Sequence, residues 1–218
     1  EGKGSMLYDY AVVFINPKTL KEELRLKDYT FIAFAEKSNT ALIKHLKTQK
    51  IYQYSLDDKK MYTPIEVGYA KDITFCHNDS LILVNPMSSS SEITFYSSKT
   101  GELVKSIEGD KATCHPNNTQ FFIVKKSYKD DNNPSLYGFD TYEEILAMKG
   151  NLEFSENGRY LIMKKGKRRS IIDLQTSQRK LSFEDRVQVE TLDDDNLIAI
   201  SISDNQVVEF YDIEQEKH

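Results

Sequence analysis

The residues most able to do chemistry in this sequence are basic, and they gather in short polar segments between apolar runs. The densest segment, residues 164–169 (KKGKRR), holds five basic residues in six. Ammonium and guanidinium groups bind phosphates and carboxylates through charge-assisted hydrogen bonds. This density predicts an acidic partner: an acidic or phosphorylated peptide, a nucleic-acid backbone or anionic lipid head groups. Lysines in loops can equally serve only to keep a surface soluble.

Two similar segments occur at corresponding places earlier in the chain, 125–129 (KKSYK) and 44–50 (KHLKTQK). The candidate partner-binding residues are Lys164, Lys165, Lys167, Arg168, Arg169, Lys125, Lys126, Lys129, Lys47 and Lys50. The KKGKRR segment also has the general form of a nuclear localisation signal, which makes a nuclear location an alternative to a cytoplasmic one.

Motifs for catalysis are missing from the sequence. It has no G-x-S-x-G, no H-E-x-x-H, no phosphate-binding glycine loop and no dinucleotide fingerprint. Its four histidines, at positions 45, 77, 115 and 218, have no acid or nucleophile at an informative spacing. We therefore expect a protein that is not an enzyme and that needs no cofactor.

The two cysteines, Cys76 and Cys114, are each followed by a histidine. Two Cys-His pairs this far apart lack zinc-ligand spacing, and two cysteines cannot make a disulfide framework. We expect no metal, and we expect both cysteines to act as small apolar residues at the ends of inner strands. Cysteines that form no disulfide are typical of a reducing compartment, so we expect a cytoplasmic location.

Composition indicates one β-rich domain. The chain has 218 residues and 39% hydrophobic residues, with 13 Tyr and 11 Phe but no Trp. Its net charge of −5 argues against a general nucleic-acid binder. No apolar run approaches the ~18 residues that cross a bilayer, and no signal peptide is recognisable. We expect residues 1–6 (EGKGSM) to be an expression scar or disordered, and residues 7–218 to form a single domain.

Short apolar runs recur in groups of four. Residues 72–109 hold runs at 73–75, 81–84, 93–96 and 103–107, separated by turn-forming HNDS, Ser-rich and KTGE segments. A first marker consists of an apolar residue, then a polar turn, then an apolar strand. It occurs at 34–43, 75–83, 114–123, 154–162 and 192–198. Four strands in about forty residues, repeated, predict the four-stranded antiparallel blades of a β-propeller. Residues 141–148 could pass for a helix, but the repeat makes them a turn plus a strand.

A second marker ends the third strand of each repeat, at 14–21, 54–60, 96–102, 139–144, 172–178 and 211–216. With these motifs, the chain resembles the WD40-type β-propellers. Residues 154–161 (FSENGRYL) are close to that family's F-S-P-D-G-x-x-L hairpin, and Phe139-Asp140, Ile172-Asp173 and Tyr211-Asp212 stand where its Trp-Asp would be. The chain departs from the family in having no Trp and no Gly-His dipeptide before a first strand, so no subfamily is carried over.

The strands counted in order do not fill a whole number of blades. Residues 10–15 and 22–26 supply a third and a fourth strand, four complete blades follow at 30–67, 73–109, 112–150 and 152–185, and three strands end the chain. Residues 22–26 could supply the missing fourth strand of the last blade and close a five-bladed ring, with one strand left over. The alternative is a five-blade portion of a larger ring.

Turns of one kind emerge on one face of a propeller, so the basic segments would pool their charge there. The opposite face would receive the acidic turn residues Glu36, Asp57, Asp58, Asp79, Glu143, Glu144, Glu156 and those of 193–195. What the resemblance implies is a non-enzymatic interaction scaffold within a multi-subunit complex. The basic residues themselves predict that acidic or phosphorylated partners dock on the basic face. The alternatives are direct binding of RNA, DNA or anionic lipid through that face, and a regulatory propeller fragment of a larger protein.

Overall fold

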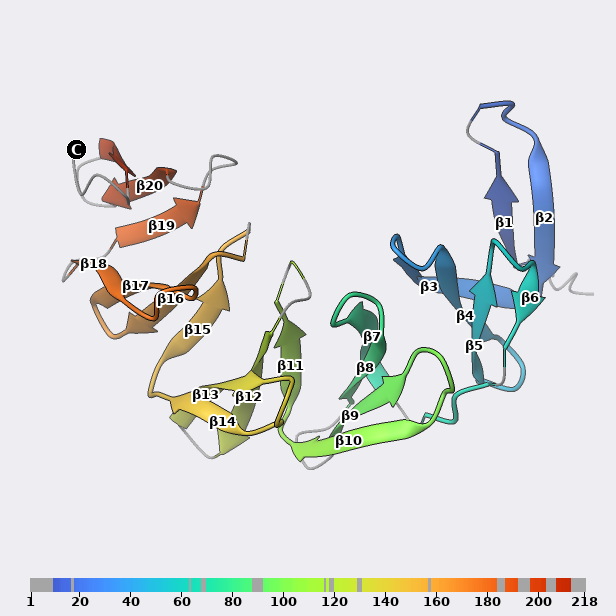
Figure 1. Cartoon of the computed structure of the whole chain (residues 1–218), viewed down its shortest axis with the longest axis horizontal. Helices are drawn as coiled ribbons and strands as arrows, with labels where there is room; N and C mark the ends of the chain where they lie inside the picture. The colour runs from blue at the N-terminus through green and yellow to red at the C-terminus, as the bar shows by residue number, and fades with distance from the viewer. Residues whose placement is uncertain are drawn as a thin grey trace, which may run out of the picture. The chain divides into compact units, whose positions relative to one another are not determined.

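A computed structural model describes residues 10–16, 18–62, 64–67, 70–87, 92–115, 117, 120–128, 131–156, 158–183, 187–191, 197–202 and 207–212. Every regular element among them is a β-strand (Figure 1). The chain divides into two compact units. The first comprises Glu1–Phe75, Asp79–Met87 and Thr94–Ser106, and the second comprises Cys76–Asn78, Ser88–Ile93 and Ile107–His218.

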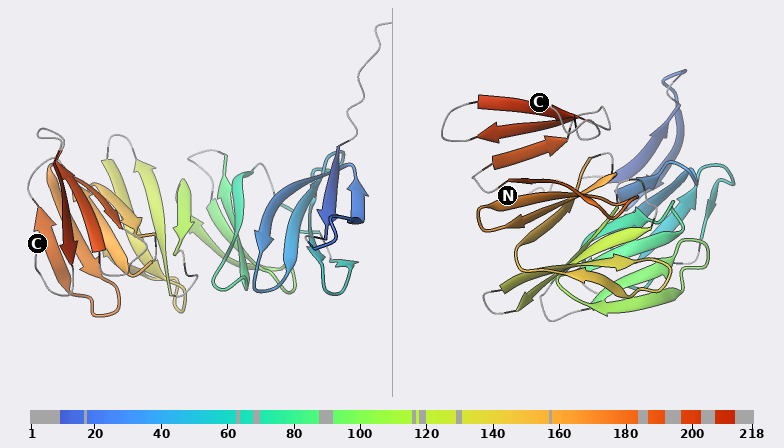
Figure 2. Two further views of the ribbon diagram at one scale, coloured as in Figure 1. Left: turned by 90° about the horizontal axis from the view of Figure 1, so that it is seen from above. Right: turned by 60° about the vertical axis from the view of Figure 1, so that its left-hand side comes forward.

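The strands form antiparallel sheets in which neighbours in sequence are neighbours in space (Figures 1 and 2). The first sheet has two strands, β1 (Ala11–Ile15) and β2 (Glu22–Lys27). Four-stranded sheets follow: β3 (Tyr29–Ala35), β4 (Thr40–His45), β5 (Ile51–Ser55), β6 (Lys60–Met61); β7 (Ala70–Cys76), β8 (Leu81–Pro86), β9 (Glu92–Ser97), β10 (Leu103–Glu108); β11 (Lys111–Cys114), β12 (Phe121–Tyr128), β13 (Asp131–Gly138), β14 (Glu144–Ala147); and β15 (Asn151–Phe154), β16 (Tyr160–Lys165), β17 (Arg168–Asp173), β18 (Arg179–Phe183). The last sheet has three strands, β19 (Val187–Thr191), β20 (Leu197–Ile202) and β21 (Val207–Asp212).

These sheets have the strand order and length of propeller blades, as the repeat pattern predicts. All four apolar runs of residues 72–109 are strands, and residues 141–148 form a turn followed by β14. The expected closure is not among the strand pairs of the described residues. Instead, β2 pairs with β1, and the C-terminal sheet consists of β19, β20 and β21. Expectations for residues 1–6 lie outside the described part of the chain.

Second strands are buried most completely, because a blade is covered on both of its faces. Every residue of β8 is buried, whereas the outer strand β10 is mostly exposed. In the first unit, one cluster joins Leu42 and Ile51 to Ile82 and Val84 of the next sheet. In the second unit, Ile123 packs with Leu161 in the same way. Each such side chain contributes about 1.5–3 kcal/mol when fully buried.

The turns that follow third strands share one design, which explains the second sequence marker. A side chain at the strand end accepts backbone N–H bonds. Asn16, directly after β1, accepts at Oδ1 from Lys18 (2.9 Å), and the last strand residues Ser97 and Asp173 accept at Oγ from Thr100 (3.1 Å) and at Oδ1 from Gln175 (2.8 Å). Four or five residues after the strand end, the backbone is left-handed in the five such turns that the structure describes: Leu20, Lys59, Gly101, Tyr142 and Ser177 have φ of 55°, 49°, 74°, 55° and 57°. Side chains that imitate a backbone turn are the reason that Asn, Ser and Asp mark this position.

Candidate functional site

The densest basic segment forms the tip of the β16–β17 hairpin. Gly166, with φ +58°, begins a two-residue turn, and Lys165 lies opposite Arg168 in the strand register. Glycine takes this left-handed conformation without steric cost, which explains its place among five cations. Lys165, Lys167 and Arg168 are exposed. They present three positive charges at the end of the sheet.

The other two cations of this hairpin have local structural partners. Arg169 donates from Nη1 to the carbonyl of Gly166 (2.9 Å) and to that of Arg168 (3.3 Å), so its guanidinium braces the turn. Lys164 forms an ion pair with Glu153 on β15. Both of these charges are therefore engaged within the hairpin and its neighbouring strand.

Lys125 and Lys126 occupy the corresponding place on β12 of the preceding sheet. Lys125 is exposed, Lys126 is half-buried, and Lys129 lies outside the described residues. The β11–β14 and β15–β18 sheets have the same strand order and pack face to face through Ile123 and Leu161. Within the second unit, the basic residues therefore lie in the C-terminal halves of two equivalent strands, β12 and β16, of the packed pair.

Lys47 and Lys50 belong to the first unit, and both are ion-paired. Lys47 Nζ lies 3.2 Å from Asp28 Oδ2, and Lys50 Nζ lies 2.8 Å from Glu66 Oε1. These pairs are exposed, and such pairs contribute about 0–1 kcal/mol to stability. They nevertheless cancel part of the positive charge that the sequence places here, so the strongest candidate surface consists of Lys125, Lys126, Lys165, Lys167 and Arg168. We call these five residues the basic end.

The acidic turn residues differ in their exposure to solvent. Glu36, Asp57, Asp58, Glu143 and Glu156 are exposed, whereas residues 193–195 lie outside the described part. Asp79 departs from the expectation of an acidic surface residue, because it is only 7% exposed. Its carboxylate accepts the backbone N–H groups of Lys37 (2.9 Å) and Ser38 (3.3 Å) on the corresponding turn of the preceding sheet. Asp79 therefore links two neighbouring turns.

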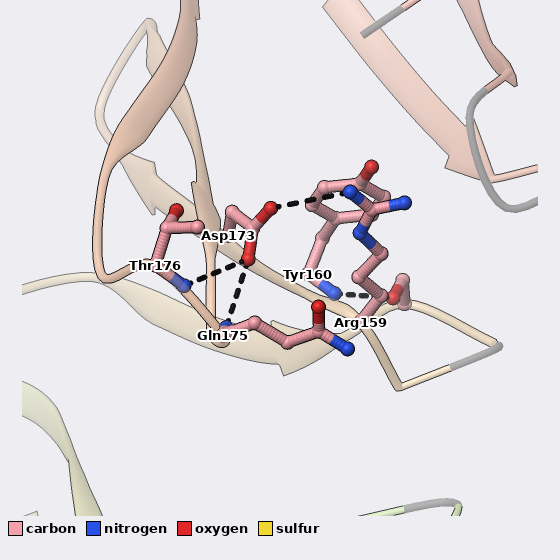
Figure 3. A network of polar contacts seen from close by, with 6 residues as sticks. Arg159, Tyr160, Asp173, Gln175 and Thr176 are labelled. Carbon is pink, nitrogen blue, oxygen red and sulfur yellow. Dashed lines mark hydrogen bonds and ion pairs between the residues drawn. The ribbon is translucent and has the colours of Figure 1, made fainter. Parts of the chain in front are cut away.

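Asp173 is the centre of a polar network in the β15–β18 sheet (Figure 3). It is 1% exposed, accepts the N–H groups of Gln175 (2.8 Å) and Thr176 (3.1 Å), and lies 3.5 Å from Arg159 Nη2. The guanidinium of Arg159 also lies over the ring of Tyr160, 5.2 Å from its centroid. A buried carboxylate needs such partners, and the network is a structural anchor of the blade.

The two cysteines form a disulfide, which corrects the expectation that they act as separate small apolar residues. Cys76 ends β7, Cys114 ends β11, and their Cα atoms lie 5.9 Å apart, within the usual range for the bond. Both do end inner strands, as expected. The expectation of a reducing compartment loses its basis, because it depended on free thiols.

His115 lies directly after this disulfide and is 5% exposed. Its Nε2–H donates to the carbonyl of Gly158 on the corresponding turn of the next sheet, and its Nδ1 accepts the N–H of Asn117 (3.1 Å). Burial lowers the pKa of His115 below its ordinary value, and the bond to Gly158 opposes this shift. The imidazole is thus held neutral with both nitrogens in use.

No group of three or more His, Cys, Asp or Glu side chains that could hold a metal ion occurs among the described residues. The sequence interpretation missed the linking roles of Asp79 and His115. A signal was present, since both lie in the turn that follows a first strand and both side chains can bond backbone groups.

A pocket of about 490 Å³ in the first unit was also missed by the sequence interpretation. It lies between β1 and β3, where Phe31 is 53% and Phe34 is 43% exposed. Residues 29–35 (YTFIAFA) carry no charge on either face, and this was the available signal.

No protein-family model and no curated protein matches the sequence. Solved structures do match. The hydrazine synthase of Kuenenia stuttgartiensis aligns with a TM-score of 0.52 at 10% identity, over 94% of this chain and 71% of that chain. KlHsv2, in a form with loop 6CD replaced by a Gly-Ser linker, aligns with a TM-score of 0.61 at 11% identity, over 94% of this chain and 72% of that chain. At these identities the likeness shows the fold alone: the sheets are those of a β-propeller.

Among the described residues, no helix is long and apolar enough to span a bilayer.

Proposed function

We propose that the chain is a diverged WD40-like β-propeller that acts as a non-enzymatic interaction scaffold and docks acidic or phosphorylated protein partners at the basic end. The observation that carries the proposal is the β16–β17 tip, where Lys165, Lys167 and Arg168 are exposed while Arg169 braces the turn beneath them. A preorganised turn loses little conformational entropy on binding, which favours its use as a docking element.

If these basic residues served only solubility, lysines scattered over the surface would be enough. Here, instead, a two-residue turn with a required glycine holds three cations close together, and Lys125 lies in the C-terminal half of the equivalent strand β12 of the adjacent sheet. Closely spaced cations on a rigid scaffold raise association rates with anionic partners. The arrangement therefore favours a docking role.

The test compares two charge-reversal variants with the same change in net charge. K165E/K167E/R168E removes the exposed tip, and K18E/K99E/K105E changes three exposed lysines elsewhere. We expect the tip variant alone to lose at least tenfold in affinity for a fluorescent phosphoserine-rich acidic peptide, with unchanged melting temperature. Equal loss in both variants would show that only net charge matters, and a lowered melting temperature in the tip variant would show a structural role.

The same variants separate the second class of ligand. Binding to single-stranded RNA or to phosphatidylserine vesicles, measured against salt concentration, reports counterion release by phosphates. Tighter binding of RNA or vesicles than of the phosphopeptide, lost only in the tip variant, would replace the scaffold proposal with a nucleic-acid or lipid function.

A further inference from the structure

The turn between β7 and β8 carries the triplet Asn78-Asp79-Ser80. Asparagine followed two residues later by serine or threonine, with any residue except proline between them, is the acceptor for N-linked carbohydrate. The sequence holds three asparagines with a hydroxyl residue at this spacing. At Asn133 the intervening residue is Pro134, which excludes it, and the triplet at 117–119 lies partly outside the described residues. Asn78 is therefore the acceptor that the structure describes in full.

This turn exposes both the acceptor amide and the hydroxyl. Asn78 and Ser80 are exposed, whereas Asp79 between them is 7% exposed. The Asp79 carboxylate accepts the N–H groups of Lys37 (2.9 Å) and Ser38 (3.3 Å), which fixes the middle of the turn. Asn78 has φ +55°, a left-handed conformation that asparagine adopts more readily than most residues. The fold thus holds the turn in place while the two side chains of the acceptor motif stay accessible to solvent.

The disulfide is an independent observation beside this turn. Cys76, two residues before Asn78, is bonded to Cys114. Disulfides form and persist in oxidising environments, such as the lumen of the endoplasmic reticulum and the cell exterior. N-linked carbohydrate belongs to surface loops of proteins that enter the same compartment. A disulfide and an exposed acceptor motif therefore agree on one location, which differs from the cytoplasm that free thiols would have indicated.

We propose that the chain passes through an oxidising, secretory compartment and carries an N-linked oligosaccharide on Asn78. In this step Nδ2 of Asn78 loses one proton and forms a bond to the anomeric carbon of an oligosaccharide. The bond between that carbon and the diphosphate of a lipid carrier breaks, and the diphosphate leaves with the bonding electrons. Ser80 supplies the hydroxyl that the acceptor motif requires. The inference uses the turn and the disulfide, so it does not depend on the basic end.

Mass spectrometry of the native protein, isolated under non-reducing conditions from the cells that produce it, tests both observations. Trypsin cleaves after lysine, so Asn78 and Asn117 fall in different peptides, 72–99 and 112–125. The disulfide joins these two peptides, since each contains one of the cysteines. We expect one linked species before reduction. After reduction, peptide 72–99 should carry the added mass of hexose and N-acetylhexosamine.

Peptide N-glycosidase F in heavy-oxygen water identifies the modified residue. The enzyme releases the sugar and converts the linked asparagine to an aspartate that retains one heavy oxygen. We expect this conversion at Asn78 and none at Asn85, which lies in the same peptide but is followed by Pro86. Sugar on peptide 72–99 that resists the enzyme would belong to its serines instead and would overturn the inference.

Three variants of the full chain, expressed in the same cells, test the motif itself. Ser80→Ala keeps Asn78 but removes the hydroxyl, and we expect the fraction of glycosylated protein to fall at least tenfold. Ser80→Thr restores a hydroxyl and should keep the glycan. The matched control is Asn151→Gln, a change at another exposed asparagine that has Glu153 two residues later, and it should leave the glycan in place.

Three further outcomes would contradict the inference. Asn78 could be unmodified in the native protein, or Ser80→Ala could keep the full glycan. Alternatively, peptides 72–99 and 112–125 could appear separately without reduction, with both cysteines as free thiols. The last result would return the chain to a reducing compartment.

Discussion

The imidazole of His115, on the turn after β11, bonds the carbonyl of Gly158, on the turn after β15. Two further links join corresponding positions of neighbouring sheets: Asp79 bonds the backbone of Lys37, and Cys76 is bonded to Cys114. Each link ties the ends of the inner strands of consecutive sheets. A carboxylate, a disulfide and an imidazole thus serve one structural purpose at the ends of first strands and in the turns that follow them.

Substitution of Gly158 should be more damaging than that of Gly166. Both have left-handed backbone, with φ of +75° and +58°, but a Cβ at Gly158 would overlap the ring of His115, whereas one at Gly166 has nothing within 4 Å. We expect Gly166→Ala to lower the free energy of unfolding by the backbone cost of about 1–2 kcal/mol, and Gly158→Ala to lower it further. Urea denaturation measures both. Equal losses would mean that the His115 contact contributes nothing.

Acid should destabilise the fold through His115. Because burial lowers its folded-state pKa, the unfolded chain binds a proton at higher pH than the folded chain does. The contribution is therefore complete above the unfolded pKa of about 6.5 and declines as the pH falls below it. Protonation of Nδ1 would also break the bond from Asn117.

Melting temperatures of the parent and His115→Gln between pH 7.5 and 5.5 test this sign. We expect the melting temperature of the parent to fall more steeply with decreasing pH than that of His115→Gln. The control is His45→Gln, a change at a histidine outside the buried links, and it should behave like the parent. A pH dependence that is the same in the parent and in His115→Gln would contradict the assignment.

Reduction should weaken the link between β7 and β11. The Cys76–Cys114 bond spans 38 residues of sequence. A crosslink of this kind contributes about 2–4 kcal/mol, chiefly by restricting the unfolded chain. We expect dithiothreitol to lower the melting temperature of the parent and to leave that of Cys76→Ser/Cys114→Ser unchanged. Alkylation of both cysteines in the native, unreduced protein, detected by mass spectrometry, would show instead that the bond does not form.

A glycine at position 177 should stabilise the protein. Ser177 has φ +57° and is exposed, at the turn position where Gly101 stands in an earlier repeat. Relief of the left-handed strain outweighs the added freedom of the unfolded chain, so we expect Ser177→Gly to add about 0.5–1 kcal/mol to the free energy of unfolding. Gln178→Gly, at an exposed neighbour with ordinary φ, is the control and should destabilise. Loss of stability in Ser177→Gly would refute the equivalence of the turns.

The sequence by itself determined the local structure. Apolar runs set the strands, and Asn, Ser, Asp and Gly set the turns, because these features depend on side-chain alternation and on backbone preferences within a few residues. The positions of β7–β10 and the turns at Asn16, Ser97 and Asp173 could therefore be predicted, as could the cluster of cations around Gly166.

Only the tertiary structure decided which residues meet across sheets. The Cys76–Cys114 bond, the burial of Asp79, the link from His115 to Gly158 and the pairing of Lys50 with Glu66 join positions between 16 and 43 residues apart. No local preference encodes such a contact, since it depends on the packing of whole sheets.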